Sequence, residues 1–541
     1  MAAVLAIPMI GMAAFAIDVG QWYVAAREAQ RAADAAALAG VTYLPGNQQK
    51  AFETAQTYAS RNGHDDDALD VEVVTGLDNG PTQLKVTVSK RVPSVLGGLF
   101  GVSGNTITRS AVADYAGPVP LGSPCNAYGN DPEPEDRRSS VCADTGDFWG
   151  NVGSPKASKG SGDAYQNGAC STSFAGCTLG ANVDYAKEGY FYSVTLEKPV
   201  NNLAIEVFDP ALVHVGDLCN KAKLSSAKAL GANAAVPDPS TRYADGATSP
   251  YCTGDQNFSG ESGGYTNMVA TQFLVRDPGT NSWDPLSFPV RSGCSGTGTY
   301  PGYTGDLSQV LNTSSAAYST KPTPLAGQVS IAQQPGYVAQ VFRRWVPLCT
   351  IANAPAGTYL IQVKTNGVGS DNGNGHNRFA LRAYSSSDSS AKEAIAISGF
   401  SKMAMYANLP NATSKFYLAR VPSGAAGQIL NVNLFDVGDA TKPGTISVLA
   451  PPRSGVTFTG CTGKGVVNAT MPTCSLNGVN SKYNGQWQTI SVPIPSGYRC
   501  DDRDSSDCWV RLEFKYGDGN QPSDTTSWSA AIEGDPVRLV E

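Results

Sequence analysis

The sequence predicts a multidomain, mainly β protein that begins with one long membrane helix. Three observations support this fold class. The chain opens on an uncharged apolar run that continues into alanine-rich sequence, which is typical of a helix. Short apolar–polar alternations follow along most of the 541 residues, between turns rich in the 58 glycines and 34 prolines. Twelve cysteines indicate disulfide-bonded domains.

The opening helix is predicted from residues 1–26, in which Asp18 is the only charged residue. A bilayer core requires about 20 apolar residues, so this segment is close to the length of a span. Trp22 and Tyr23 stand where interfacial aromatic residues are common. Alanine-rich sequence extends the helix towards Gly40, a typical helix stop. We expect a retained anchor; a cleaved signal peptide and a buried helix of a soluble domain are the alternatives.

The topology follows from the cysteines. Arg27 and Arg31 come after the apolar run, which by the positive-inside rule would place the following domains in the cytoplasm. The cysteines form two even groups, eight at 125–349 and four at 461–508, without a C-x-x-C pair, which favours disulfides in an oxidising compartment. Because large domains translocate largely regardless of charge, we expect a single-pass cell-membrane protein with its bulk extracytoplasmic. We also expect the native start to lie upstream, with basic residues.

The stretch AIDVGQWYVAAREAQRAADAAALAGV, residues 16–41, resembles the N-terminal segment of the TadE/TadG-like proteins of Flp pilus assembly, the bacterial tight adherence (Tad) system. The resemblance implies a membrane-anchored, non-catalytic pilus component, either minor pilin-like or pilus-anchoring, with other pilus-assembly or pilin-like subunits as partners. Its alanine face would let helices approach closely. Asp18 would pair with an amine or arginine of a partner, or else lie at the headgroup level or in an extracytoplasmic turn of the helix. The motif residues are Asp18, Val19, Gly20, Trp22, Tyr23 and the run Gln30–Gly40.

Residues 1–117 are expected to form one pilin-like α+β module, with the long helix packed on a small sheet. Residues 48–63 read as a short helix that ends at a glycine. Residues 70–74 and 83–93 alternate as strands, and residues 96–117 complete the module.

The remaining chain is divided by composition and by an internal repeat. Residues 118–184 are expected to be a linker with loops held by Cys125, Cys142, Cys170 and Cys177. Residues 191–210 resemble residues 416–436, and residues 349–383 resemble residues 500–534. The first copy is longer, and its insertion holds Cys219, Cys252 and Cys294. Two related jelly-roll or β-sandwich domains are therefore predicted, at 185–390 and 391–541.

The charge pattern and the motifs exclude several function classes. A net charge of -7 leaves no basic field for nucleic acid. The catalytic H-E-x-x-H and P-loop motifs do not occur, so we expect no enzyme and assign no catalytic, cofactor or metal residues. Two acidic loops could hold calcium, around Asp371 (370–375) and Asp501 (501–507). Neither has EF-hand spacing, and plain turns are the alternative reading.

A second function is compatible with the same sequence. The chain could be a surface adhesin or glycan-binding protein that uses the Tad-like helix as its anchor. Exposed tryptophans would then contact a surface ligand, whereas buried ones would belong to the core. The six tryptophans beyond the opening helix are Trp149, Trp283, Trp345, Trp487, Trp509 and Trp528.

Overall fold

The computed structural model divides the chain into two compact units. Unit 1 comprises Met1–Gly117, Gly279–Ser287 and Gly534–Glu541, and unit 2 comprises Pro118–Pro278 and Phe288–Glu533. The structure describes residues 2–44, 48–64, 68–74, 83–95, 101, 103–115, 118–130, 148–209, 270–279, 281–294, 298–301, 345–365, 375–408, 413–438, 442–502, 504, 506–517, 523–533 and 537–539.

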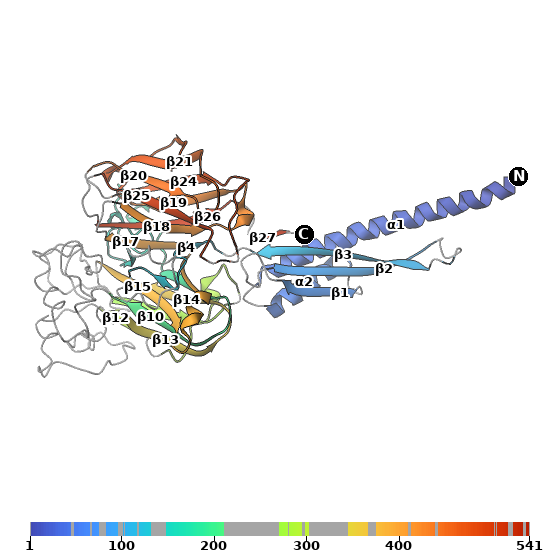
Figure 1. The fold of residues 1–541 in the computed structure, drawn as a ribbon, viewed down its shortest axis with the longest axis horizontal. Coiled ribbons are helices and arrows are strands. Elements are labelled where there is room, and N and C mark those ends of the chain that lie inside the picture. The colour runs from blue at the N-terminus through green and yellow to red at the C-terminus, as the bar shows by residue number, and fades with distance from the viewer. Residues whose placement is uncertain are drawn as a thin grey trace, which may run out of the picture. The chain divides into compact units, whose positions relative to one another are not determined.

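Unit 1 packs two helices on one antiparallel sheet (Figure 1). The helices are α1 (Ala2–Val41) and α2 (Gln48–Arg61). The sheet order is β1-β2-β3-β27, with β1 at Ala68–Val74, β2 at Gln83–Pro93, β3 at Gly104–Tyr115 and β27 at Val537–Leu539. The helix and both strands expected after residue 47 are therefore present, and Gly63 follows α2 in the left-handed region, with φ +83°.

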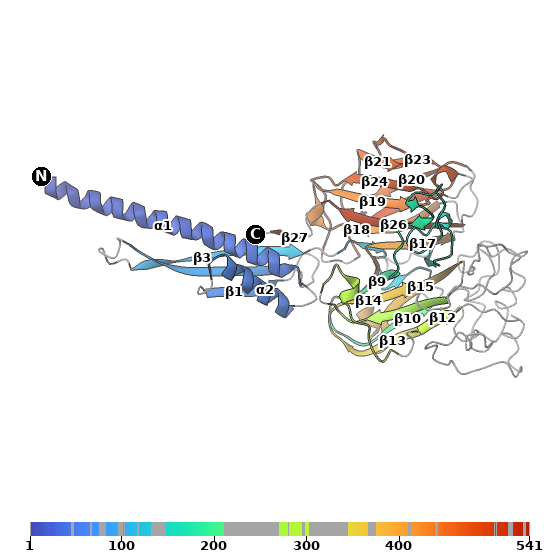
Figure 2. The ribbon, with the colours of Figure 1, turned by 180° about the vertical axis from the view of Figure 1, so that it is seen from behind.

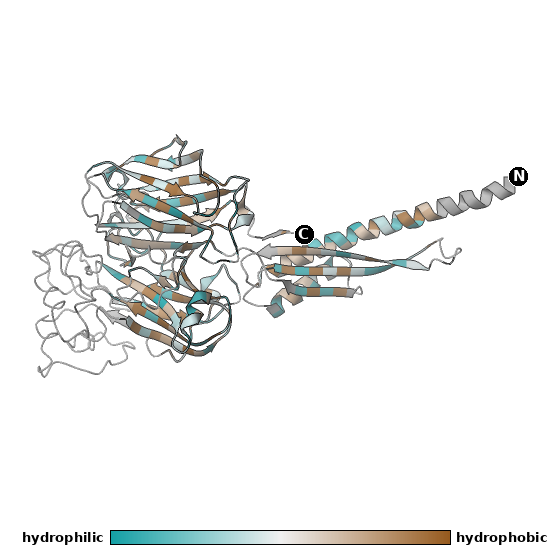
Figure 3. Cartoon of the chain, in the orientation of Figure 1, coloured by the Kyte–Doolittle hydropathy of each residue, from teal (hydrophilic) through white to brown (hydrophobic). Residues whose placement is uncertain are grey.

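The core of unit 1 lies between the sheet and the helices. Hydropathy alternates along β2, as the banding of Figure 3 shows, and the first half of the strand alternates between buried and partly buried residues. Against the buried residues lies an alanine face of α1, whose residues recur at helical spacing and are fully buried. The face expected to meet a partner helix is thus largely used within the unit, which corrects that expectation. This part of the core consists of Leu84, Val86 and Val88 of β2 and Ala29, Ala32, Ala33, Ala36 and Ala37 of α1, and alanines of α2 and β3 add to it.

Gly40 lies inside α1 and is not its stop, because the helix continues to Val41. A Cβ at Gly40 would come within 2.5 Å of Leu84 Cδ2 and 2.7 Å of the Ala51 carbonyl oxygen. Only glycine therefore allows α1 to approach both α2 and the sheet this closely.

Unit 2 is inserted into unit 1 between β3 and β27. Strand β27 pairs with β3 through Val537–Tyr115, Arg538–Asp114 and Leu539–Ala113. The assignment of all residues up to 541 to the second sandwich was therefore wrong at its end. Three residues of alternating character are too few to be recognised as a separate strand from periodicity.

Unit 2 contains two large antiparallel sheets (Figure 2). Buried side chains of both sheets belong to one hydrophobic core. We name the two sheets sheet I and sheet II. Sheet I has the order β13 (Trp345–Ala354), β10 (Val200–Phe208), β15 (His376–Ser385), β6 (Phe148–Gly153), β17 (Lys402–Asn408), β26 (Ser523–Ile532), β19 (Ile429–Phe435), β24 (Trp487–Pro493), β21 (Cys461–Gly465) and β22 (Thr470–Met471), with β5 (Ala127–Tyr128) on β15. Sheet II has the order β12 (Gly298–Pro301), β11 (Ala270–Arg276), β14 (Gly357–Lys364), β9 (Tyr190–Leu196), β16 (Ile395–Phe400), β4 (Pro120–Gly122), β18 (Thr413–Arg420), β25 (Trp509–Lys515), β20 (Gly444–Leu449) and β23 (Ser475–Val479).

The internal repeat has a counterpart in the order of the strands. In sheet II the run β11-β14-β9 is matched by β20-β25-β18, and in sheet I the run β13-β10-β15 is matched by β24-β19-β26. Strands β9 and β10 carry the segment 191–210, while β18 and β19 carry its counterpart 416–436. Segments that resemble each other in sequence thus occupy equivalent positions in the two halves of unit 2.

The two halves are joined by strands from the region expected to be a linker, which corrects that prediction. Strand β6 lies between β15 and β17, and β4 lies between β16 and β18, so both sheets continue across the expected boundary at residue 390. Every residue of β6, Phe148–Gly153, is buried, so its sequence shows no alternation from which a strand could be predicted.

The chain also crosses between the sheets directly after that boundary. Strand β16 belongs to sheet II and β17 to sheet I, with only Ser401 between them. Ser401 has φ +64°, the left-handed conformation that turns the chain sharply. The chain therefore passes from sheet II to sheet I at the start of the second half.

Disulfides lie within each cysteine group, as the even counts predicted. The described pairs are Cys170–Cys177 and Cys294–Cys349 in the first group, and Cys461–Cys474 and Cys500–Cys508 in the second. Cys125 is also disulfide-bonded. Two short strands, β7 (Cys177–Thr178) and β8 (Ala181–Asn182), pair beside the first of these bridges. Among the described residues, 3-10 helices lie at Lys159–Ser161, Pro285–Ser287, Ser389–Ala394, Ser423–Ala425 and Ser481–Tyr483.

Candidate functional site

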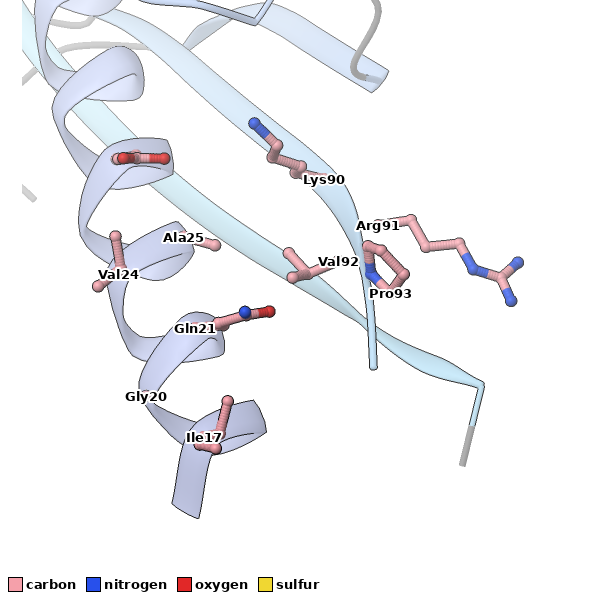
Figure 4. Close-up of a pocket in the computed structure, with 10 residues that line it drawn as sticks. Ile17, Gly20, Gln21, Val24, Ala25, Lys90, Arg91, Val92 and Pro93 are labelled. Atoms are coloured by element: carbon pink, nitrogen blue, oxygen red, sulfur yellow. The ribbon is translucent and has the colours of Figure 1, made fainter. Parts of the chain in front are cut away.

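A groove runs between α1 and the end of β2 in unit 1 (Figure 4). Its volume is about 460 Å³. The helix contributes Ile17, Gly20, Gln21, Val24, Ala25 and Glu28, and the strand contributes Lys90–Pro93. The groove exists because β2 and β3 form a long hairpin beside α1, paired from Gln83–Asp114 to Pro93–Gly104.

Asp18 fastens the end of this hairpin to α1. Its side chain is buried, with 2% exposure. The backbone N–H of Val95 donates to Asp18 Oδ1 at 2.7 Å, and the Ser94 hydroxyl donates to Oδ2. Hydrogen bonds to an ionised group contribute about 1.5–3 kcal/mol each, so the two bonds offset much of the cost of burying the carboxylate. Asp18 therefore has partners within its own chain, a reading that the sequence did not suggest.

Several apolar side chains near Asp18 in the sequence of α1, and one at the end of the hairpin, are exposed. Phe15 is 65% exposed, Tyr23 is 64% exposed and Val95 is 57% exposed. Tyr23 was recognised from the sequence, whereas Val95 and Ser94 lie beyond β2 and meet α1 only in the tertiary fold.

Hydropathy alone does not identify α1 as a span. Within the part of the chain that the structure describes, no helix reaches the combined length and hydropathy used to recognise a membrane-crossing segment.

Of the two loops expected to bind calcium, the structure describes mainly the second, residues 501–507. The loop of Asp371 lies outside the described residues. In the second loop, the carboxylate of Asp502 accepts hydrogen bonds from the Ser423 backbone N–H, at 2.9 Å, and from its hydroxyl. Asp507 accepts from the N–H of Asp501 at 3.3 Å. Asp502 and Asp507 thus act as acceptors for neighbouring turns, and the nearby sulfurs of Cys500 and Cys508 are joined in a disulfide.

The tryptophans belong mostly to the core. Trp149 and Trp528 are fully buried, Trp345 and Trp509 are buried, and Trp487 is partly buried. Trp283 alone among the six is exposed, at 43%.

Unit 2 also contains a buried cation that the sequence did not reveal. The Lys159 side chain is fully buried, and its Nζ lies 2.6 Å from Asp184 Oδ2. Trp487 Nε1 donates to the same oxygen at 3.2 Å, and the Phe435 ring centroid lies 5.1 Å from Nζ. A buried charge that is paired in this way is a structural feature, because an unpaired one would destabilise the fold strongly.

Asp163 is the second buried ionisable group of this region. Burial raises the pKa of its carboxyl, while the Tyr190 hydroxyl and the backbone N–H groups of Gly153, Gln166 and Tyr165 act in the opposite direction by hydrogen bonding. Tyr190 donates at 2.5 Å and Gly153 at 2.8 Å. This set of donors ties the loop after β6 to strand β9.

Comparison with known proteins gives one match, at the N-terminus. Residues 1–43 match the family model described as "Putative Flp pilus-assembly TadE/G-like". The resemblance stated from the motif of residues 16–41 is therefore confirmed over this segment, which contains α1 and Asp18. No curated protein matches the chain, and no solved structure matches it.

Proposed function

We propose that this protein is a membrane-anchored, non-catalytic component of a Tad/Flp-type pilus-assembly system. The observation that carries the proposal is the family match over residues 1–43, on a helix whose later half is packed against its own small sheet. The helix would then present only its first part to the membrane, while the β units lie outside. Its role is structural, as a minor pilin-like or pilus-anchoring subunit.

The disulfides support an extracytoplasmic location for unit 2. Four described bridges span positions from Cys170 to Cys508, and no described cysteine is free. Disulfides persist in oxidising compartments and are rare in the cytosol. The partners we propose are the membrane and other pilus-assembly or pilin-like subunits.

The proposal is tested by fractionation of the native cell. The full-length protein should remain in the membrane fraction after alkaline extraction, and external protease should remove the 185–541 region. Thiol labelling before and after reduction should show the cysteines oxidised. A variant that lacks residues 2–17 should leave the membrane fraction.

Two results would contradict the proposal. Recovery of the wild-type protein from the medium without residues 1–40 would identify the helix as a cleaved signal and favour a secreted binding protein. A protein that is membrane-bound but whose deletion leaves pilus number and retention unchanged would favour the surface adhesin, with Trp283 as the first residue to examine.

A further inference from the structure

We propose that the end of the β2–β3 hairpin, Pro93–Val95, docks on the extracytoplasmic surface of the bilayer beside α1, and that Asp18 is the latch that holds it there. The partner is a lipid surface with anionic headgroups. This inference rests on the anchor in the proposed function and adds a second membrane contact to it.

The end of the hairpin lies level with the end of the apolar segment of α1. Residues 1–17 are uncharged, so a span formed by them ends near Asp18. The N–H of Val95 bonds the Asp18 carboxylate directly, at 2.7 Å. Whatever surrounds α1 at the end of its apolar segment therefore surrounds Val95 too.

The chemistry of this end suits a bilayer interface. Val95 and Tyr23 expose most of their side chains, and Pro93 is also exposed. Tyrosine is common at the bilayer interface, and basic residues meet the phosphates of anionic lipids there. An exposed valine at the same level adds apolar surface that can enter the headgroup region. Basic side chains outnumber acidic ones here, with Arg27, Lys90 and Arg91 against Asp18 and Glu28.

The hydrogen bonds from Ser94 and Val95 explain how Asp18 can lie close to lipid. An Asp beside lipid is costly unless its oxygens are hydrogen-bonded. Ser94 and Val95 supply a donor to each oxygen, so the hairpin satisfies Asp18 while Asp18 fixes the hairpin. Removing the carboxylate should release the hairpin end without removing the anchor.

The test uses site-specific fluorescence in the full-length protein. The protein is reconstituted in vesicles of phosphatidylethanolamine and phosphatidylglycerol, and an environment-sensitive dye is attached to Val95→Cys. Two other labelled variants are compared with it, Phe15→Cys within the apolar segment and Ser110→Cys on β3. Ser110 accepts a hydrogen bond from Gln30 through its carbonyl and so lies roughly 18 Å along the helix from Asp18, beyond the interface. Wild-type protein sets the background labelling.

The expected pattern separates the two proposals. The dye at Phe15 should be quenched by spin labels on lipid acyl chains, the dye at Val95 by spin labels near the headgroups, and the dye at Ser110 only by an aqueous quencher. An aqueous signal at Phe15 would overturn the anchor itself. Quenching at Phe15 with an aqueous signal at Val95 would overturn the docking alone. A Val95 dye shielded from both quenchers would identify a protein occupant of the groove and also overturn it.

The latch is tested in the same vesicles with the Val95 dye. Asp18→Ala should reduce headgroup quenching, because loss of charge-assisted hydrogen bonds shifts the ratio of docked to released hairpin by roughly tenfold. Ser94→Ala removes one donor and should have a smaller effect in the same direction. Phe15 quenching should stay unchanged in both variants. Unchanged Val95 quenching in Asp18→Ala would show that Asp18 is not the latch.

Discussion

At the scale of single residues, two features stand out: small side chains at the close contacts of α1, and charged side chains that are buried. Gly40 allows α1 to meet α2 and Leu84, and the alanines of α1 fill the space above β2. Asp18 and Lys159 are buried charges with partners far away in sequence, Val95 and Asp184. Such residues look unremarkable along the chain and are understood only from their contacts.

Gly40→Ala should destabilise unit 1, although alanine favours a helix. The added Cβ would overlap Leu84 Cδ2 and the Ala51 carbonyl, and overpacking of this kind costs about 1–3 kcal/mol. Gly20→Ala in the same helix is the matched control, because nothing lies within 4 Å of its Cβ position. It should be neutral or slightly stabilising. Hydrogen exchange of the α1 and α2 amides in the full chain reports the difference, and equal protection in both variants would contradict this account.

At the scale of elements, the sheet of unit 1 depends on a strand from the other end of the chain. Strand β27 covers the edge of β3 with three residue pairs. An uncovered edge leaves backbone donors and acceptors without strand partners.

Truncation after Glu533 should therefore weaken unit 1 by about 1–3 kcal/mol, the net value of a few hydrogen bonds. The loss should appear as faster hydrogen exchange in β3, in the region of Ala113, in the full-length background. Leu539→Ser is the control, because it keeps the backbone pairing and changes a side chain that is already 41% exposed. A truncated chain with unchanged exchange in β3 would show that β27 adds no stability.

At the scale of the whole molecule, the two halves of unit 2 are one folded body. The strands β6 and β4 from residues 118–153 connect the halves in both sheets, and the hydrophobic core extends through both. Separating the halves would expose sheet edges on each side of the cut as well as part of this core.

Residues 185–390 and 391–533, produced separately, should therefore fail to form stable monomers, whereas residues 118–533 should fold. Far-UV circular dichroism, cooperative melting and size-exclusion chromatography under oxidising conditions distinguish the cases. Reassembly of the two halves would require residues 118–184 to be supplied with one of them. A stable, cooperatively melting 391–533 fragment would show instead that the second sandwich is an independent domain.

The sequence by itself determined the local features: the long helix with its family motif, the helix and strands of residues 48–93, the mainly β character, the repeat and the disulfide groups. These follow from periodicity, alanine content and cysteine counts, which act over short stretches. Only the tertiary structure decided that β4, β6 and β27 complete sheets begun elsewhere, and that Asp18 meets Ser94 and Val95. Each of those contacts joins residues that are distant along the chain. A local sequence pattern does not specify which distant strand or carboxylate will form hydrogen bonds with a short segment.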